Sequence, residues 1–145
     1  MSIPVIDIAA FFVGSWSIRR RILDLRQGQV GWLTGDALFR PHSEGLHYEE
    51  TGRLSLGDYR GNTTQSYLWR FDSPSQARIH FTDGRPFHSL DLSRGRAGVS
   101  HDCAPDLYRG KYHVHGSGLW SLAWRIEGPR KNQIIVTRFR RNRVT

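Results

Sequence analysis

The sequence predicts an all-β protein, built as an antiparallel sandwich or barrel. After residue 15, apolar and polar residues alternate with a period of two along most of the chain, as in a strand with one buried face. Turn-forming residues, mainly glycine, proline, asparagine and aspartate, interrupt this alternation about every ten residues. No helical stretch separates the alternating segments, so short turns are expected to join neighbouring antiparallel strands.

Each alternating segment between two turn signals predicts one strand. The expected strands are 16–26, 30–40, 45–54, 63–71, 76–82, 86–92, 107–115, 118–127 and 132–141. The clearest turn is Asp83-Gly84, because this dipeptide favours a two-residue hairpin. One short helix, around residues 6–12, is expected ahead of the first strand.

The length of 145 residues and the hydrophobic content of 38% predict one globular domain, residues 1–145. Cys103 is the one cysteine, which fits a reducing compartment and leads us to expect a cytoplasmic protein. The apolar N-terminal stretch contains Asp7 and is too short to span a bilayer, so no membrane association is expected. We expect a monomer or a homodimer.

The chain is strongly basic, with a formal net charge of +8 at pH 7. Arginines cluster at 19–21 and 138–143, on the first and last expected strands, and such charge attracts the phosphates of RNA. Neither a known nucleic-acid motif nor an identifiable exposed aromatic residue accompanies them. Solvated arginines on outer strand faces explain the charge without a partner, and an RNA-binding surface is kept as an alternative.

Large aromatic residues mark the inward face of several strands. Tyr67 and Trp69 share one face of their strand, as do Trp120 and Trp124 of theirs. These faces are opposed by smaller or polar residues. An inner face so rich in aromatic rings is typical of either a filled core or a lined cavity.

Arg20 is four residues after Trp16, so the two side chains point to the same side of the strand, or have the same phase. A strand that buries the tryptophan therefore also directs a cation into the interior. On other strands a carboxylate, a histidine and several tyrosines share the aromatic phase. The candidate ligand-binding residues are Arg20, Tyr48, Glu50, Tyr67, Trp69, His88, Tyr108, Tyr112, Trp120 and Trp124. One interpretation is a polar patch that orients a carboxylate-bearing ligand in an apolar cup. The other is an internal salt bridge that sets strand register.

Two further groups have the composition of chemical sites. His101, Cys103 and Asp106 suggest either a cysteine nucleophile with a histidine or a loop in which Cys103 packs and the others cap turns. His113 and His115 have the same-face spacing of strand-borne metal sites. Their face is expected outside the sheet and a third ligand is not evident, so we expect no metal site.

A short helix is expected just before the motif Gly14-x-Trp16, and this motif lies at the start of the first expected strand. The segments that follow include "YEETG" (48–52), "YLWRF" (67–71), "DGRPFHSLD" (83–91), "HDCAPDLYRG" (101–110) and "WRIEGPRK" (124–131). In this order they resemble a bacterial lipocalin-like family of unknown function within the calycin superfamily. The resemblance implies a closed up-and-down barrel of eight to ten strands, in which Arg138 or Arg140 of the final strand packs over Trp16.

Calycins bind small, mostly hydrophobic ligands, and a few relatives bind haem or catalyse reactions inside the cup. The resemblance therefore implies a barrel that binds a small, partly apolar ligand, with a carboxylate as one option for its polar end. One alternative is an enzyme of the lyase or isomerase type that uses acid–base residues in the cavity. Another is a haem-binding barrel with His88 as the axial ligand; otherwise no cofactor is expected.

Overall fold

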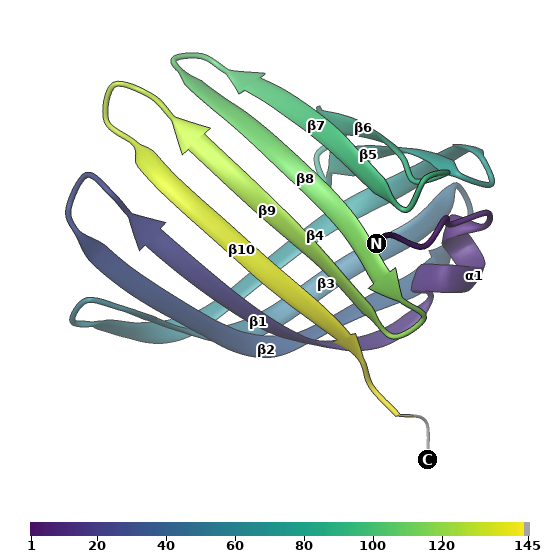
Figure 1. Ribbon diagram of the computed structural model, residues 1–145, viewed down its shortest axis with the longest axis horizontal. Helices are drawn as coiled ribbons and strands as arrows, with labels where there is room; N and C mark the ends of the chain where they lie inside the picture. The colour runs from purple at the N-terminus through teal and green to yellow at the C-terminus, as the bar shows by residue number, and fades with distance from the viewer. Residues whose placement is uncertain (144–145) are drawn as a thin grey trace.

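The computed structural model describes residues 1–143 and confirms the all-β prediction. One short helix precedes ten strands that curve into a nearly closed barrel (Figure 1). The elements are α1 (Ile8–Phe12), β1 (Gly14–Asp24), β2 (Gln29–His42), β3 (Gly45–Leu56), β4 (Tyr59–Ser73), β5 (Gln76–Phe81), β6 (Pro86–Asp91), β7 (Arg96–Cys103), β8 (Asp106–Gly116), β9 (Leu119–Glu127) and β10 (Asn132–Arg141).

The strands form one antiparallel sheet in the order β6-β5-β4-β3-β2-β1-β10-β9-β8-β7. The last strand therefore returns to pair with the first, as an up-and-down barrel requires. Within the described residues no backbone pairing joins β6 to β7, which leaves a seam on this side of the barrel. Beside it, the Ile3 amide donates to the Val114 carbonyl and the Val5 amide to the Leu92 carbonyl, each at 3.0 Å.

The helix α1 closes one end of the barrel (Figure 1). The Asp7 carboxylate caps it by accepting a hydrogen bond from the amide three residues later, at 3.1 Å. Ile8 and Phe12 are fully buried, and the Phe12 ring centroid lies 5.1 Å from that of Trp69 and 5.0 Å from that of Trp120. No helix among residues 1–143 combines the length and the hydropathy needed to cross a membrane.

Trp16, at the start of β1, joins the helix to the barrel. Its side chain is fully buried, and its indole N–H donates to the Phe12 carbonyl at 2.9 Å. Gly14 begins the strand at φ +113°, a conformation that glycine adopts without steric strain. The guanidinium carbon of Arg141 lies 4.2 Å from the centroid of the Trp16 ring, within cation–π range.

The arginine over Trp16 is thus Arg141, and the expectation of Arg138 or Arg140 was wrong. Trp16 is the direct cross-strand partner of Arg141 in the β1–β10 register. Arg138 and Arg140 are both exposed, on the outer face of β10, whereas Phe139 between them is buried. Successive residues of a strand point to opposite sides, so the side of each arginine depends on the pairing register.

The strand β7 was not predicted, because its sequence lacks the large apolar residues that mark the other strands. Its inward positions carry Ala97, Val99 and His101, and all three are only half-buried. One of the two interpretations of His101, Cys103 and Asp106 was a loop in which Cys103 packs. Instead β7 extends through Cys103, whose side chain is exposed.

We predict that Gly14→Ala destabilises the fold by about 1–3 kcal/mol, because a Cβ atom is strained at this positive φ. Urea denaturation of the variant and the wild type measures the loss. Gly98→Ala in β7 is the matched control, since its backbone φ is ordinary and a Cβ there meets no atom within 4 Å. Equal midpoints for the two variants would contradict the prediction.

Candidate functional site

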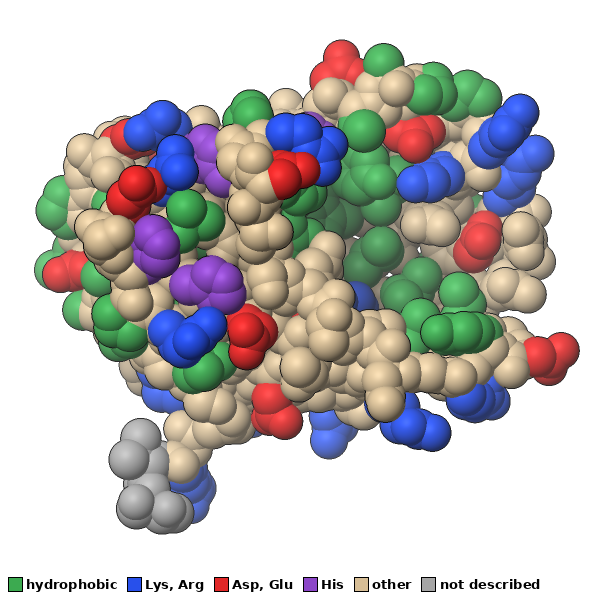
Figure 2. Space-filling view, turned by 180° about the vertical axis from the view of Figure 1, so that it is seen from behind, with side chains coloured by type: hydrophobic (Ala, Val, Ile, Leu, Met, Phe, Trp, Pro, Cys, Tyr) green, Lys and Arg blue, Asp and Glu red, His purple; other side chains and the backbone are tan. Residues whose placement is uncertain are grey.

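A cavity of about 320 Å³ lies inside the barrel, between the plug formed by α1 and the opposite, open end. The hollow and its apolar lining are visible in Figure 2. All ten predicted ligand-binding residues line this cavity: Arg20, Tyr48, Glu50, Tyr67, Trp69, His88, Tyr108, Tyr112, Trp120 and Trp124. The structure brings them together because each occupies an inward position of its strand. That they contact a ligand stays a prediction.

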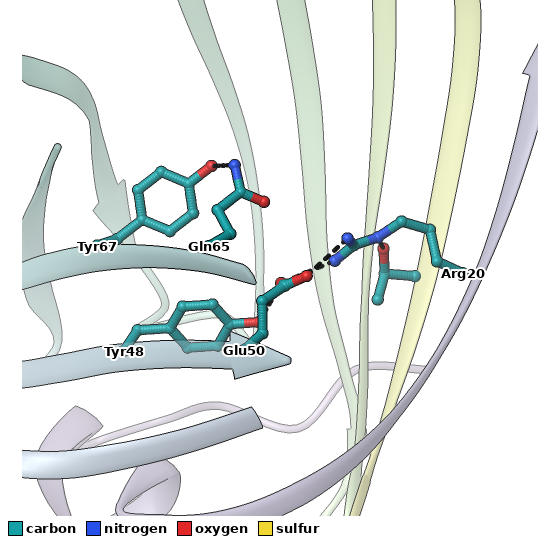
Figure 3. Close-up of polar contacts among 6 residues, drawn as sticks. Arg20, Tyr48, Glu50, Gln65 and Tyr67 are labelled. Atoms are coloured by element: carbon teal, nitrogen blue, oxygen red, sulfur yellow. Dashed lines mark hydrogen bonds and ion pairs between the residues drawn. The ribbon is translucent and has the colours of Figure 1, made fainter. Parts of the chain in front are cut away.

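The polar centre of the cavity is an ion pair between Arg20 of β1 and Glu50 of β3 (Figure 3). The two terminal guanidinium nitrogens lie 2.8 and 2.9 Å from the two carboxylate oxygens, so the pair is bidentate. The side chains are 15% and 4% exposed, respectively. Charges this deeply buried need direct partners, and here each charge is the partner of the other.

Two hydroxyl groups complete the coordination of this pair. Tyr48 donates to a Glu50 oxygen at 2.7 Å, and the Arg20 Nε donates to the Thr137 hydroxyl at 2.7 Å. Burial lowers the pKa of Arg20, but the hydrogen bonds and the charge of Glu50 outweigh it and leave that pKa raised. Burial, followed by the Glu50 charge, holds the pKa of Tyr48 well above its ordinary value. The cluster is therefore a satisfied, neutral unit.

Tyr67 is a second polar group on the same side of the cavity (Figure 3). Gln65 donates its side-chain amide to the Tyr67 hydroxyl, so the phenolic hydrogen remains available to another acceptor. Burial and the nearby Glu50 charge raise the pKa of Tyr67, and the phenol stays protonated at neutral pH. Gln65 was missed from the sequence, although its inward phase on β4 is the same as that of Tyr67.

His88 of β6 and Tyr112 of β8 form the other polar pair. The His88 Nδ1 faces the Ser89 carbonyl at 3.3 Å, and Nε2 faces the Tyr112 hydroxyl at 3.1 Å. Because a carbonyl only accepts, this pattern assigns the hydrogen to Nδ1 and makes Nε2 the acceptor from Tyr112. Burial lowers the pKa of His88 to about 4, so the imidazole is neutral at pH 7.

Phe87 also lines the cavity, although strict alternation placed it opposite His88 on the outer face. The β5–β6 register shifts at this point: Ile79 pairs with His88, but His80 pairs with Pro86. Phe87 is the extra residue of a β-bulge, which lets two consecutive side chains turn inward. The Phe87 ring stacks on Trp124 at 5.3 Å and becomes part of the aromatic wall.

Tyr108 lies nearer the open end of the cavity than the buried clusters do. Its hydroxyl is 3.5 Å from the Lys131 ammonium, which lies 3.6 Å from the Asp106 carboxylate. The nearby Tyr108 and Asp106 raise the pKa of Lys131. This rim is polar and charged, in contrast to the neutral interior.

The residues suggested for a cysteine nucleophile lie near the β7–β8 turn, where Cys103 is the cross-strand partner of Asp106, but no hydrogen bond within residues 1–143 joins their side chains. His101 packs edge-on against Phe87 across the seam, with ring centroids 5.0 Å apart. Asp106 pairs with Lys131, and Cys103 is exposed. A thiolate needs a neighbouring base or cation to be activated. Within the described residues, Cys103 has no hydrogen-bonded base or cation to activate it.

The cavity does not fit a haem with His88 as its axial ligand, because both ring nitrogens already face protein partners. His113 and His115 stack with centroids 4.1 Å apart and contact the N-terminal backbone and Ser121, not the cavity. Within residues 1–143, no cluster of three or more histidine, cysteine or acidic side chains is arranged to hold a metal ion.

The chain matches the family of unknown function DUF6314 over residues 12–141. It belongs to this family. The curated proteins include no match to the sequence. The lipocalin-like family suggested by the sequence is consistent with this result and with the fold.

The solved structures that are similar over nearly the whole chain include the following two. One is the S-type phycobiliprotein lyase CPES from Guillardia theta, with a TM-score of 0.70 and 9% identity, covering 99% of this chain and 95% of that chain. The other is a protein of unknown function from the DUF3598 family of Nostoc punctiforme PCC 73102, with a TM-score of 0.63 and 12% identity, covering 97% of this chain and 51% of that chain. At these identities the likeness shows the shared barrel fold.

We predict that Glu50→Gln destabilises the protein by about 3–5 kcal/mol, because it leaves the Arg20 charge buried without a counter-ion. Arg20→Met should recover part of this loss in the double variant, since it removes the orphaned charge. Urea denaturation of the wild type, both single variants and the double variant gives the coupling energy.

Asp72→Asn, which breaks the exposed Arg78–Asp72 pair, is the control and should have a much smaller effect. Strictly additive losses for Glu50→Gln and Arg20→Met would show that the two side chains are not coupled.

We predict that stability falls as the pH is lowered from about 6.5 to about 4. The His88 pKa is lowered from 6.5 to about 4 in the folded protein, so the unfolded chain takes up this proton first. The contribution of neutral His88 to the free energy of unfolding is fully present above pH 6.5. By about pH 4, about 3 kcal/mol of it is lost. The free energy of unfolding is measured by urea denaturation at several pH values. In His88→Gln it should no longer show this decrease between pH 6.5 and about 4. An unchanged pH profile in that variant would refute the assignment.

Proposed function

We propose that the protein binds a small, flat and largely apolar molecule inside the barrel. The observation that carries the proposal is the aromatic-lined cavity of about 320 Å³. Protein interiors are normally close-packed, so a cavity of this size at the centre of a 145-residue chain needs a reason. Its volume and its apolar walls with a few convergent polar groups are those of a ligand site.

The charge state of the interior supports a neutral polar group on the ligand. Arg20 was considered as a partner for a ligand carboxylate, but its bidentate partner is Glu50. A ligand carboxylate has to compete with this pair and add an uncompensated negative charge to the cavity. The hydroxyl of Tyr67 offers a neutral donor instead.

Two buried polar atoms of cavity-lining residues lack a partner within residues 1–143. The Trp120 indole N–H and the Thr63 hydroxyl belong to cavity-lining residues, are buried, and have no hydrogen-bond partner within the described residues. A buried donor without an acceptor is unfavourable by about 1–3 kcal/mol. Both atoms have almost no surface open to the cavity, so a ligand reaches them only after the neighbouring side chains shift.

The hydrogen bonds of Glu50 and His88 favour ligand binding over acid–base catalysis. Glu50 and His88 are the groups best suited to proton transfer, and each is held by two protein partners. The fold is shared with a phycobiliprotein lyase, so the architecture is compatible with catalysis in another protein. Turnover that disappears in His88→Gln while ligand binding persists would favour the enzyme.

The proposal is tested with a variant in which a larger side chain fills the cavity, by measuring how well it binds a neutral, flat probe. Leu122→Trp adds an indole to the cavity wall, and we expect it to weaken Nile red binding, followed by dye fluorescence, at least about tenfold. Ala123→Trp is the matched control, because this adjacent residue of β9 points to the outer face. Equal dye binding by the two variants would contradict a cavity site.

A further inference from the structure

Four arginines form a compact block on the outer wall of the barrel. Arg19 and Arg21 lie on β1, Arg138 and Arg140 lie on β10, and all four are exposed. Residues two apart on a strand are separated by about 6.6–6.8 Å, and neighbouring strands by about 4.8 Å, so backbone positions of neighbouring members lie about 5–8 Å apart and those of Arg21 and Arg140, the most distant pair, about 14 Å apart. We call Arg19, Arg21, Arg138 and Arg140 the arginine block.

The arginine block is not neutralised by the protein. Within residues 1–143, none of its members lies within 4.0 Å of a carboxylate. Arg19 is the direct cross-strand partner of Arg138, and like charges in this position repel each other. The outer positions of β1, β2 and β10 carry one carboxylate, Asp36, which forms no ion pair. An anionic partner would relieve this repulsion.

An exposed tryptophan lies directly beside the arginine block. Trp32 of β2 is 56% exposed and is the cross-strand partner of Arg21. The Arg21 guanidinium carbon lies 5.7 Å from the centroid of the Trp32 ring. The sequence showed no aromatic residue suited to base stacking next to these arginines, and the register supplies one.

The positive charge continues along the same row of the sheet. Arg53 of β3 is opposite Thr34 of β2, which is opposite Arg19. The row passes through Arg138 and reaches the exposed Arg96 of β7 on the far side. In Figure 2, Lys and Arg side chains project from the lower edge of the molecule, where Figure 1 places β1 and β2. The charge therefore forms a stripe from Arg138 through Arg19 to Arg53, whereas Arg96 is separated from it by Ser121 and His113.

We propose that the arginine block and Trp32 form a binding surface for single-stranded nucleic acid. Guanidinium groups pair bidentately with phosphate oxygens, and an elongated stripe suits a phosphodiester backbone. An exposed indole next to the charges is a stacking platform for an unpaired base. A second copy of the chain is a poor occupant, because two molecules of charge +8 repel each other.

The test measures binding of fluorescein-labelled 20-nucleotide oligo(U) and oligo(dT) by fluorescence anisotropy. Micromolar affinity is expected at low salt, with log K falling against log[salt] at a slope of about −3 for four phosphate contacts on a single strand. Arg19→Ser/Arg138→Ser should roughly halve that slope. Trp32→Ala should weaken binding about fivefold or more, since one stacked base is lost.

Matched controls separate the surface from general charge. Arg85→Gln/Arg94→Gln removes two exposed positive charges elsewhere and should leave the slope unchanged. Tyr59→Ala removes an aromatic ring that is equally exposed, at 56%, but lies outside the stripe, and should leave affinity unchanged. Arg19→Ser/Arg138→Ser should also raise the urea midpoint of the free protein, because the cross-strand repulsion is removed.

Three outcomes would overturn the proposal. The first is no oligonucleotide binding at low salt, and the second is an equal salt slope for Arg19→Ser/Arg138→Ser and its control. The third is that the protein binds phosphatidylglycerol-containing vesicles but not oligonucleotides. If Arg19→Ser/Arg138→Ser then loses vesicle binding, the surface is assigned to a membrane. Retention of oligonucleotide binding in Leu122→Trp would show that the surface is independent of the cavity.

Discussion

The buried ion pair between Arg20 and Glu50 is the constraint on which the interior of this barrel depends. It joins β1 to β3 and, through Thr137, also contacts β10. It therefore connects strands on both sides of the pairing between the first and last strands. Two buried charges are tolerable only when each satisfies the other, and this requirement sets the positions of their neighbours. Tyr48 and Tyr67 are neutral phenols beside the pair, and the remaining walls are mainly aromatic and aliphatic side chains.

The protein separates its charge between two surfaces of one sheet. The inner surface carries a matched pair and a neutral histidine, whereas the outer wall of β1 and β10 carries cations without counter-ions. A neutral interior suits an uncharged ligand, and an unbalanced exterior suits a polyanion. Alternation of side chains along a strand allows both surfaces to be encoded in the same segments, such as the arginine run of β1.

Much of the cavity could be predicted because phase is a local property. Once the aromatic face of a strand is taken as inward, Arg20, Glu50 and Tyr112 follow by counting in steps of two. Phe87 could not be found this way, since a bulge is a property of the pairing between two strands and not of one. Arg141 was missed for a related reason: three arginines lie within four residues, and only the register with β1 selects the one that covers Trp16.

The all-β class, the strand periodicity and the side of the sheet on which each regular residue lies follow from the amino-acid sequence, because these depend on neighbours along the chain. The pairing of the strands in three dimensions selects Arg141 as the arginine over Trp16, makes Glu50 the partner of Arg20, and places Trp32 beside the outer arginines. Those contacts join residues far apart in sequence. Their existence depends on the register and curvature of ten strands together, which no single segment specifies.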